Sequence, residues 1–425
     1  MNPPNPETRW PLLLCLTFRF LFVYFLLYFL PFPLNVIPKT ESLLEPYKNL
    51  WNAVVPWVGK HLLHLPYDIT VLPNGSGDTT YNYVQVFCYA LLAAGAALLW
   101  SLLARQRRTH PRLHEGLRIY LRFSLATTII FYGVVKVIKS QFPDPTLDRL
   151  LQPFGDASPM GLLWTFMGYS EGYNLFTGLG EILGGLLLTT RRTTLLGALV
   201  SAAVMAHVVV LNFCYDVPVK LYSLHLLATA LFLAAPDLPR LLNFFVLNRP
   251  VAPAPLSPLF RRKWLESTVV VVRTLLVLCY LGWHLYQTYD SRGRAFPKSP
   301  LYGAWEVEEF VLDGKTLPAV SMEVTRWRRV VFDWQMYLAV QTMDDVRERY
   351  RSELDLGKGT LRLSPWGQMG QPSLFTVRQP SPDRLDLEGT LEGHAIKARL
   401  RRTDLAPFRL TNRGFHWINE YPFNR

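Results

Sequence analysis

Four ionisable residues lie inside apolar stretches of the sequence that are long enough to cross a membrane. They are Lys136, Glu181, His207 and His225. An ionisable side chain inside a bilayer costs free energy, so such residues usually pair with one another or serve a function. A carboxylate, an amine and two imidazoles can exchange protons and stabilise a developing negative charge. We therefore predict that these four residues form one site and act as its catalytic groups.

Four more polar residues belong to the helical hairpin that carries the two histidines. They are predicted to bind a ligand at the mouth of the site: Asn212, Asp216, Lys220 and Tyr222. Structural roles are the alternative, because an intramembrane histidine can bond a backbone carbonyl and a lysine can extend toward the headgroups. Asp216 and Lys220 can form a local ion pair. Glu181 is the hardest to explain structurally, because a short carboxylate cannot reach out of the membrane.

The composition indicates a membrane protein. Of the 425 residues, 50% are hydrophobic and only 18% are charged, which is unusual for a soluble protein. The net charge of +12 does not indicate a nucleic-acid binder, because the basic residues stand beside apolar runs. The four cysteines have no paired spacing, which argues against a disulfide framework and a dithiol relay. No haem, iron–sulfur, flavin or GxGxxG motif is visible and no metal site is predicted, so the cofactor is unknown.

Seven helices are predicted to cross the membrane, because about 20 mostly apolar residues span its hydrocarbon core. They cover residues 11–31, 83–103, 117–139, 173–190, 193–213, 218–235 and 267–287. The first stretch is too long for a signal-peptide core and lacks a small-residue cleavage site, so we expect it to remain as an anchor. Seven spans place the two ends of the chain on opposite sides.

Three loops are rich in basic residues, and seven spans place all three on the same side. They contain Arg105, Arg107, Arg108 and Arg112; Arg191 and Arg192; and Arg261, Arg262 and Lys263. The positive-inside rule makes that side the cytoplasm and places the N-terminus there. Residues 32–82, 140–172, 214–217 and everything after about 288 then lie outside. We predict a multi-pass protein of the inner (plasma) membrane, with the four ionisable groups in the outer third of the bilayer.

Small residues predict where two of the helices touch, because they let backbones approach closely. They are Gly178, Gly180, Gly184 and Gly185 in the fourth predicted span and Gly197, Ala198, Ser201 and Ala202 in the fifth. We expect these two helices to pack together. Arg19, Arg122 and Arg273 lie nearer the cytoplasmic side, where headgroup contact or helix pairing is expected.

Beyond about residue 290 the pattern changes from long apolar runs to short alternating stretches. The predicted strands cover residues 304–312, 326–334, 336–343, 360–364, 374–379, 384–391 and 394–402. Turn signals separate them, including Asp313-Gly314 and Glu392-Gly393. Consecutive short strands with hairpin-length turns suit an antiparallel barrel or sandwich.

The stretch "YGAWEVEEF" resembles the G-x-W opening strand of lipocalin-like barrels, with Gly303 and Trp305 at the matching positions. In that fold an arginine of the last strand covers the tryptophan, and the resemblance makes Arg413 the candidate. The final segment contains His416, Glu420 and Arg425. It is expected to be a terminal strand that packs its aromatic residues into the barrel, although a site is the alternative.

The four spans from about 117 to 236 resemble the DoxX family of membrane proteins. The resemblance rests on Arg122, Gly133 and Lys136 in "RFSLATTIIFYGVVKVIKSQF", on Glu181-x-x-Gly-Gly in "GLGEILGGLLLTTRRTTLLGAL", and on the hairpin "LNFCYDVPVKLYSLHLL". It implies a four-helix membrane bundle and, more loosely, a relation to membrane oxidoreductase subunits that hand electrons to quinone. The predicted fold is thus an α-helical polytopic membrane bundle of about seven transmembrane helices followed by an antiparallel β-barrel.

Four domains follow from these observations. They are an N-terminal transmembrane pair with an extracytoplasmic loop (1–116), the DoxX-like bundle (117–236), a cytoplasmic linker with the last transmembrane helix (237–290), and an extracytoplasmic lipocalin-like domain (291–425). Residues 153–174 are expected to form an outer lid or an interfacial helix. Residues 74–76, Asn-Gly-Ser, fit a glycosylation acceptor only in a host that glycosylates secreted proteins.

Two functions remain open. In the first, the protein is a redox subunit whose outward-facing intramembrane site handles a quinone or another amphipathic substrate, with electrons supplied by a partner protein or an unidentified cofactor. In the second, the β-barrel binds a lipid or hydrophobic ligand without catalysis. Membrane lipids are expected partners in both cases, and nucleic acid is not.

Overall fold

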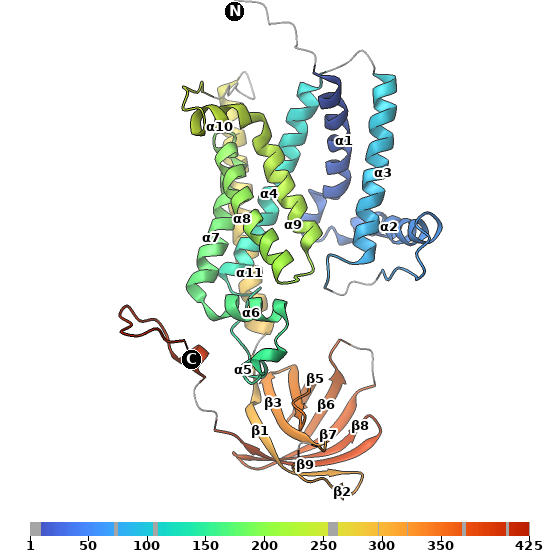
Figure 1. Cartoon of the computed structure of the whole chain (residues 1–425), viewed down its shortest axis with the longest axis vertical. Coiled ribbons are helices and arrows are strands. Elements are labelled where there is room, and N and C mark those ends of the chain that lie inside the picture. Colours follow the sequence, from blue (N-terminus) through green and yellow to red (C-terminus); the bar gives the residue numbers. More distant parts are fainter. Residues whose placement is uncertain are drawn as a thin grey trace, which may run out of the picture. The chain divides into compact units, whose positions relative to one another are not determined.

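The chain folds into a helical unit and a barrel unit (Figure 1). The computed structural model describes residues 10–71, 75–104, 109–253, 262–295, 297–320, 322–367, 371–404 and 408–424. The helical unit comprises Met1–Ile138 and Gly172–Tyr286, and the barrel unit comprises Lys139–Glu171 and Gln287–Arg425. Asn74 and the predicted basic residues Arg105, Arg107, Arg108 and Arg261 lie outside the described residues.

Nine α-helices occur wholly or mostly within the described part of the helical unit. They are α1 (Leu12–Phe29), α2 (Glu41–His61), α3 (Thr80–Leu103), α4 (Pro111–Val137), α7 (Glu171–Thr189), α8 (Thr194–Cys214), α9 (Lys220–Ala234), α10 (Leu238–Phe245) and α11 (Lys263–Ala295). The four-residue α5 and the longer α6 belong to the barrel unit. The predicted helical membrane bundle is therefore confirmed as a fold class.

Six helices among the described residues are long and apolar enough to cross a membrane: α1, α3, α4, α8, α9 and α11, some with short flanking turns. They correspond to six of the seven predicted spans. The remaining one, α7, forms a 19-residue helix but is not among the six. Its glycines, Asn174 and Glu181 lower its hydropathy.

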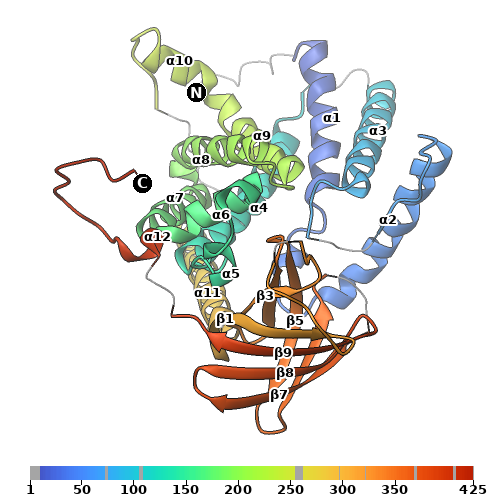
Figure 2. The same cartoon turned by 60° about the horizontal axis from the view of Figure 1, so that its bottom comes forward.

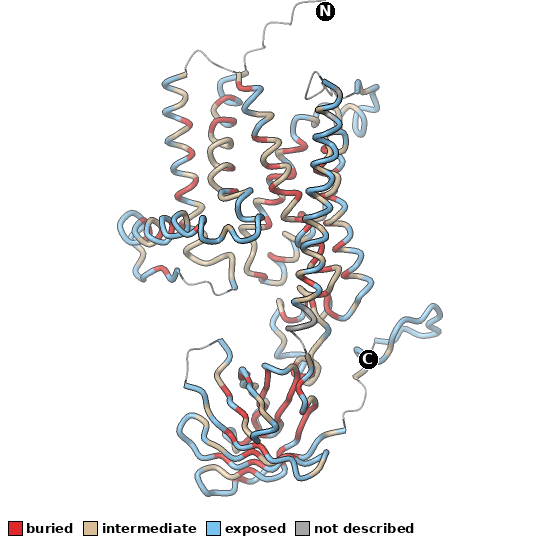
Figure 3. The backbone as a smooth tube through the Cα atoms, turned by 180° about the vertical axis from the view of Figure 1, so that it is seen from behind, coloured by how far each residue is buried: buried red, intermediate tan, exposed pale blue. Residues whose placement is uncertain are grey.

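The core of the helical unit lies along α4. The side chains of Leu117, Leu121, Leu125 and Ile129 recur every four residues, and each is at most 2% exposed. This spacing places them on one face of the helix. They pack against Leu188, Met205, Leu226 and Leu233 from α7, α8 and α9. In contrast, α11 is exposed along most of its length (Figure 3).

Arg19 connects α1 to α3. Its side chain is only 3% exposed and donates hydrogen bonds to Ser101 Oγ (2.8 Å), the Ala104 carbonyl (3.3 Å) and His110 Nε2 (3.3 Å). It therefore satisfies a carbonyl at the C-terminal end of α3, where the helix leaves such groups without partners. The expected helix-pairing role is confirmed for Arg19. Arg122 of α4 makes a longer bond to Thr194 Oγ1 (3.4 Å).

The helix ends fall into two groups within the helical unit. The C-terminal end of α3 and the N-terminal end of α4 lie at one end, together with the turn between α7 and α8 and the start of α11. The α8–α9 turn lies at the other end (Figures 1 and 2). The described basic residues Arg112 and Arg191 belong to the first group. α2 lies across the direction of α1 and α3, near the start of α3 (Figure 1).

The barrel unit contains a closed antiparallel barrel of eight strands. They are β1 (Lys298–Leu312), β3 (Trp327–Trp334), β4 (Tyr337–Thr342), β5 (Arg347–Asp355), β6 (Thr360–Pro365), β7 (Ser373–Ser381), β8 (Arg384–Leu391) and β9 (His394–Arg402). Each pairs with the next, and β9 pairs with β1 to close the barrel. The two-residue β2 (Lys315–Thr316) extends β1. The predicted barrel is confirmed.

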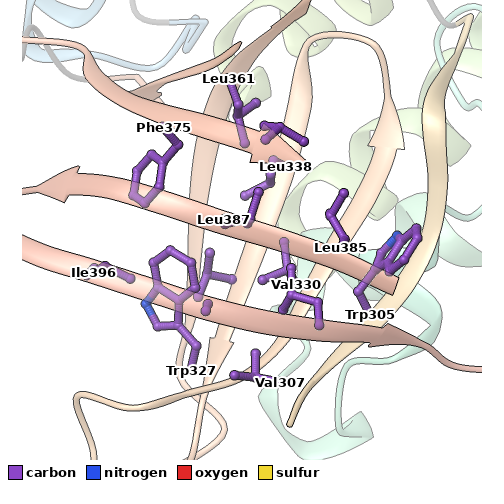
Figure 4. Packing of buried hydrophobic residues seen from close by; sticks show 14 of the residues in the cluster. Trp305, Val307, Trp327, Val330, Leu338, Leu361, Phe375, Leu385, Leu387 and Ile396 are labelled. Atoms are coloured by element: carbon purple, nitrogen blue, oxygen red, sulfur yellow. The ribbon is translucent and has the colours of Figure 1, made fainter. Parts of the chain in front are cut away.

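Sequence reasoning missed β5, because its exposed positions are mostly charged and only Tyr350 and Ser352 are buried. The interior of the barrel is filled by large apolar side chains (Figure 4). Trp305, Phe310, Phe332 and Phe375 are each at most 1% exposed. An eight-stranded barrel is just wide enough for side chains to fill, so this interior is a packed core.

The arginine over Trp305 is Arg402, not the predicted Arg413. The Arg402 guanidinium carbon lies 6.0 Å from the Trp305 ring centroid, and Nη2 donates to the Tyr302 carbonyl (3.1 Å). The prediction was wrong because the last strand ends at Arg402, which pairs in register with Trp305. Arg413 lies beyond the barrel and stacks over Phe423.

The predicted terminal strand is also wrong. After the short helix α12 (Arg409–Asn412), residues 413–424 form no regular structure. Trp417 is 90% exposed, and His416 and Glu420 are exposed as well. Gly414 and Pro422 interrupt this segment, and both residue types are disfavoured inside a strand. Arg425 lies outside the described residues.

The segment 139–171 packs on the outside of the barrel. It contains α5 (Leu147–Leu150), the 3₁₀ turn η2 (Phe154–Asp156) and α6 (Pro159–Tyr169). Leu147 is buried against apolar residues of β1, β3 and β4. The sequence predicts an outer lid or an interfacial helix for residues 153–174, and the structure places most of this stretch in the barrel unit.

Asp148 of α5 is the polar centre of this contact. Its carboxylate is 7% exposed and lies 2.9 Å from Arg347 Nη1 and 3.1 Å from Arg349 Nε. Tyr337 also donates its hydroxyl to the same carboxylate at 2.7 Å. Three side chains from two strands thus converge on one buried acid, which fixes α5 on the barrel wall.

The first prediction concerns Asp148→Asn. The substitution keeps the shape of the side chain at position 148 but leaves Arg347 and Arg349 without their counter-charge. We expect the free energy needed to detach α5 from the barrel wall to fall by about 2 kcal/mol. This is less than for a fully buried ion pair, because Arg349 is 40% exposed. Hydrogen exchange of residues 146–151 in the full-length protein measures the change. Glu353→Gln, whose partner Arg362 is 3.9 Å away at an exposed site, is the control. Equal exchange in both variants would contradict the role of Asp148.

The second prediction concerns Asp333, which accepts a hydrogen bond from the Asp148 amide (3.4 Å). Burial raises the pKa of the Asp333 carboxyl above its ordinary value. An acid with a raised folded-state pKa favours folding when protonated, and this contribution is lost as pH rises from its ordinary pKa through the raised value. The Asp333→Asn variant lacks this pH-dependent contribution to its stability. The stability of the variant relative to the wild type should therefore increase as the pH rises above about 4, as measured by chemical unfolding. A constant difference would refute this account.

Candidate functional site

Lys136 of α4 and Glu181 of α7 form a buried ion pair. The Lys136 Nζ atom lies 2.8 Å from both carboxylate oxygens of Glu181. The two side chains are only 9% and 3% exposed. Removing two charges from water is costly, and the cost is recovered only where the geometry is good. The structure therefore brings together two of the four predicted catalytic residues.

Glycines allow α4 and α7 to approach closely enough for this pair to form. A Cβ atom at Gly133 would lie 2.6 Å from the Gly178 carbonyl oxygen, and one at Gly178 would lie 2.7 Å from the Gly133 oxygen. A Cβ atom at Gly185 would similarly lie 2.9 Å from the Ala126 oxygen. Only glycine fits at such backbone contacts. The sequence predicted small-residue packing for α7, but it did not identify α4 as a partner.

The predicted contact between α7 and α8 is confirmed. A Cβ atom at Gly184 would lie 2.9 Å from Ser201 Oγ, and one at Gly197 would lie 2.7 Å from the Leu188 amide nitrogen. The helix that carries Glu181 is thus held on two sides, by α4 and by α8. This packing fixes the direction of the carboxylate.

Tyrosines extend the ion pair toward α9. The Lys136 Nζ atom lies 5.7 Å from the centre of the Tyr132 ring. The Tyr132 ring in turn lies 6.3 Å from that of Tyr222 on α9, whose hydroxyl is 3.5 Å from Thr128 Oγ1. The predicted binding residue Tyr222 therefore faces α4, near the pair. Tyr132 was not singled out from the sequence.

His225 of α9 faces α1. Its Nε2 atom lies 2.6 Å from the Tyr24 hydroxyl, and its Nδ1 atom lies 2.7 Å from the Leu221 carbonyl oxygen. A carbonyl only accepts, so Nδ1 carries a proton; in the neutral ring Nε2 then accepts the Tyr24 proton. The ring also stacks on Tyr28 with centroids 3.8 Å apart. Sequence reasoning missed both tyrosines because it treated α1 as a separate anchor.

The predicted meeting of all four residues is corrected, because His225 contacts Tyr24 and Tyr28 of α1 and not the ion pair, and His207 joins neither group. The residue is exposed on α8. The buried face of α8 includes Ser201, Met205 and Asn212. His207 follows Met205 by two positions and is rotated by about 200° around the helix. The position of His207 along its helix follows from the sequence, whereas this rotation depends on which face packs.

The other predicted binding residues have structural partners. Asn212 donates to Ser223 Oγ (3.0 Å) and so links α8 to α9. Asp216 and Lys220 form the local ion pair that was the alternative reading, at 2.8 Å. Asp78, which the sequence did not single out, accepts the backbone N–H groups of Lys220 (2.7 Å) and Leu221 (2.9 Å). It thereby satisfies the N-terminus of α9.

No group of three or more His, Cys, Asp or Glu residues that could hold a metal ion occurs among the described residues. The described cysteines are Cys15 and Cys88, which are buried, and Cys214 and Cys279, which are exposed; all four are free. The arrangement that remains consists of an ion pair, tyrosine hydroxyls and one imidazole. Such groups can donate, accept and relay protons.

Comparison with known proteins identifies a relative. The uncharacterized protein YwoB of Bacillus subtilis (strain 168) is 32% identical over 140 residues, which are 32% of this chain and 88% of YwoB. The chain belongs to the YwoB family. No family model and no solved structure matches it. Membership of the YwoB family assigns no activity, because YwoB is uncharacterized, and the DoxX resemblance stays a prediction.

The third prediction tests the close contact of α4 and α7. Gly178→Ala inserts a methyl group against the Gly133 carbonyl, and such overpacking typically costs about 1–3 kcal/mol. Gly95→Ala in α3 is the control, because nothing lies within 4 Å of its Cβ position. It should stabilise the protein by about 0.5–1 kcal/mol, since glycine weakens a helix interior. Unfolding in mild detergent measures both changes. If both substitutions changed the free energy of unfolding in the same direction, the contact between α4 and α7 would be disproved.

Proposed function

We propose that this protein is a redox subunit whose helix bundle binds a quinone or a similar amphipathic molecule and exchanges protons with it. The observation that carries the proposal is the buried Lys136–Glu181 ion pair, with both distances at 2.8 Å. Charged groups within membrane-spanning helices usually mark a substrate or proton pathway. The tyrosines and His225 supply further groups that can carry protons.

Reduction of a quinone to a quinol takes up two electrons and two protons. The electrons come from a redox partner protein or another external donor, and the bundle supplies the protons. An ammonium group has three donor protons, so Lys136 can bond a quinone oxygen while still holding Glu181. Its positive charge stabilises the negative charge that develops on that oxygen. Glu181 and the Tyr24–His225 pair then act as proton donors and acceptors.

The packed barrel favours this function over ligand binding in the barrel. Large side chains occupy the interior, including Trp305, Trp327 and Phe375. A lipid would have to displace them, at a cost similar to that of disrupting a protein core. The lipid-handling alternative therefore has less support, although lipids remain partners of the helical unit.

We further propose that the basic helix ends face the cytoplasm and that the barrel unit is extracytoplasmic, in a plasma membrane. Arg112, Arg191 and Arg192 support this orientation through the positive-inside rule. The orientation counts α7 as the fourth span. Its packing against both α4 and α8 supports that assignment.

The fourth prediction tests the function with a short-chain benzoquinone and the full-length protein in lipid nanodiscs. Quenching of tryptophan fluorescence measures binding. We expect Glu181→Gln and His225→Ala each to weaken binding at least several-fold, because each removes a group that exchanges protons with the quinone. His207→Ala is the matched control and should bind as the wild type does, because His207 is exposed.

A double variant separates function from folding. Replacing both Lys136 and Glu181 with methionine removes the ion pair without leaving a lone buried charge, and such exchanges are often neutral or stabilising. We expect a folded protein that no longer binds the quinone. Wild-type binding by the folded double variant would overturn the proposed function, because the pair would then be only a helix contact.

A further inference from the structure

The helix α2 combines an unusual direction with an unusual surface. It lies across α1 and α3, which are long and apolar enough to cross a membrane (Figure 1). Three of its large apolar side chains are exposed: Leu43 (66%), Leu50 (56%) and Trp57 (61%). They recur every seven residues and therefore share one face of the helix.

A second face of α2 packs against α3. Trp51, Val55 and Val58 are buried with Val84 and Cys88 of α3. On a helical wheel this buried face lies next to the exposed apolar face, so the two form one continuous apolar sector. The sector is wider than the contact with α3 requires.

The opposite side of α2 is polar. It carries Glu45, Lys48, Asn49 and Lys60, all of which are exposed. A helix with one apolar and one polar side, lying across membrane-spanning helices, has the character of a helix in the membrane interface. Its exposed tryptophan suits the same environment, because tryptophan is enriched at the level of the lipid headgroups.

We propose that α2 lies in the membrane interface and inserts Leu43, Leu50 and Trp57 among the lipids. The occupant of its exposed apolar face is thus the bilayer that surrounds α1 and α3, because the face is continuous with the surface by which α2 joins α3. This inference does not depend on the proposed redox function.

The charges of α2 indicate how it binds. Its two glutamates and two lysines, Glu41, Glu45, Lys48 and Lys60, balance one another. Apolar contact therefore dominates, and the depth of α2 should not depend on anionic lipid. The segment that follows α2 is also tied to α9, because Gly77 donates to the Pro218 carbonyl (2.8 Å) and Asp78 binds the start of α9. These bonds join the segment before α3 to the hairpin that carries His225.

A labelling experiment with the full chain tests the proposal. Cys214→Ser and Cys279→Ser remove the exposed thiols, and this background serves as the unlabelled control. A bimane fluorophore is then attached after Leu50→Cys on the apolar face or Glu45→Cys on the polar face. Nanodiscs of phosphatidylcholine, with and without nitroxide-bearing acyl chains, supply the lipid quencher, and iodide supplies the aqueous quencher.

We expect acyl-chain nitroxide to quench the label at position 50 several-fold more than that at position 45, and iodide to show the reverse order. Adding phosphatidylglycerol should leave both values unchanged. Trp57→Cys gives a second apolar position if Leu50→Cys disturbs folding. Equal quenching at both positions would overturn the proposal. Protection of position 50 from both quenchers would also overturn it, because a protein would then cover this face.

Discussion

The ion pair between Lys136 and Glu181 is the constraint on which the helical unit depends. Two charges can remain inside the bundle only if they stay together, because a lone buried charge would destabilise the fold by several kcal/mol. The pair therefore requires α4 and α7 to approach at backbone distance, which Gly133 and Gly178 permit. Gly178 and the other glycines of α7 lower its hydropathy, so the position of α7 relies on its contacts with α4 and α8.

The positions of the helices could be predicted from the sequence, but the directions of their side chains could not. Apolar length gives the helices, and small residues indicated the contact of α7 with α8. The rotation of each helix depends on tertiary packing, which is why His207 is exposed whereas His225 meets Tyr24 and Tyr28. His225 therefore contacts two residues of α1 that no local pattern singles out.

The barrel unit shows the same division. Alternating residues identified most strands, but β5 was missed because its exposed residues are charged. The contact of Asp148 with Arg347 and Arg349 joins residues about 200 positions apart, and no local sequence signal reports it. Arg402 rather than Arg413 covers Trp305 because strand register, and not the order of arginines, determines that contact.

The most direct test of the central claim is infrared difference spectroscopy of the full-length protein, recorded on addition of a short-chain benzoquinone under reducing conditions. If Glu181 exchanges protons with the substrate, a carboxyl C=O band should change in the wild type and be absent from Glu181→Gln. The band should persist in His207→Ala. A wild type that binds the quinone without any change in a carboxyl band would contradict the assignment of Glu181 as a proton-exchanging group.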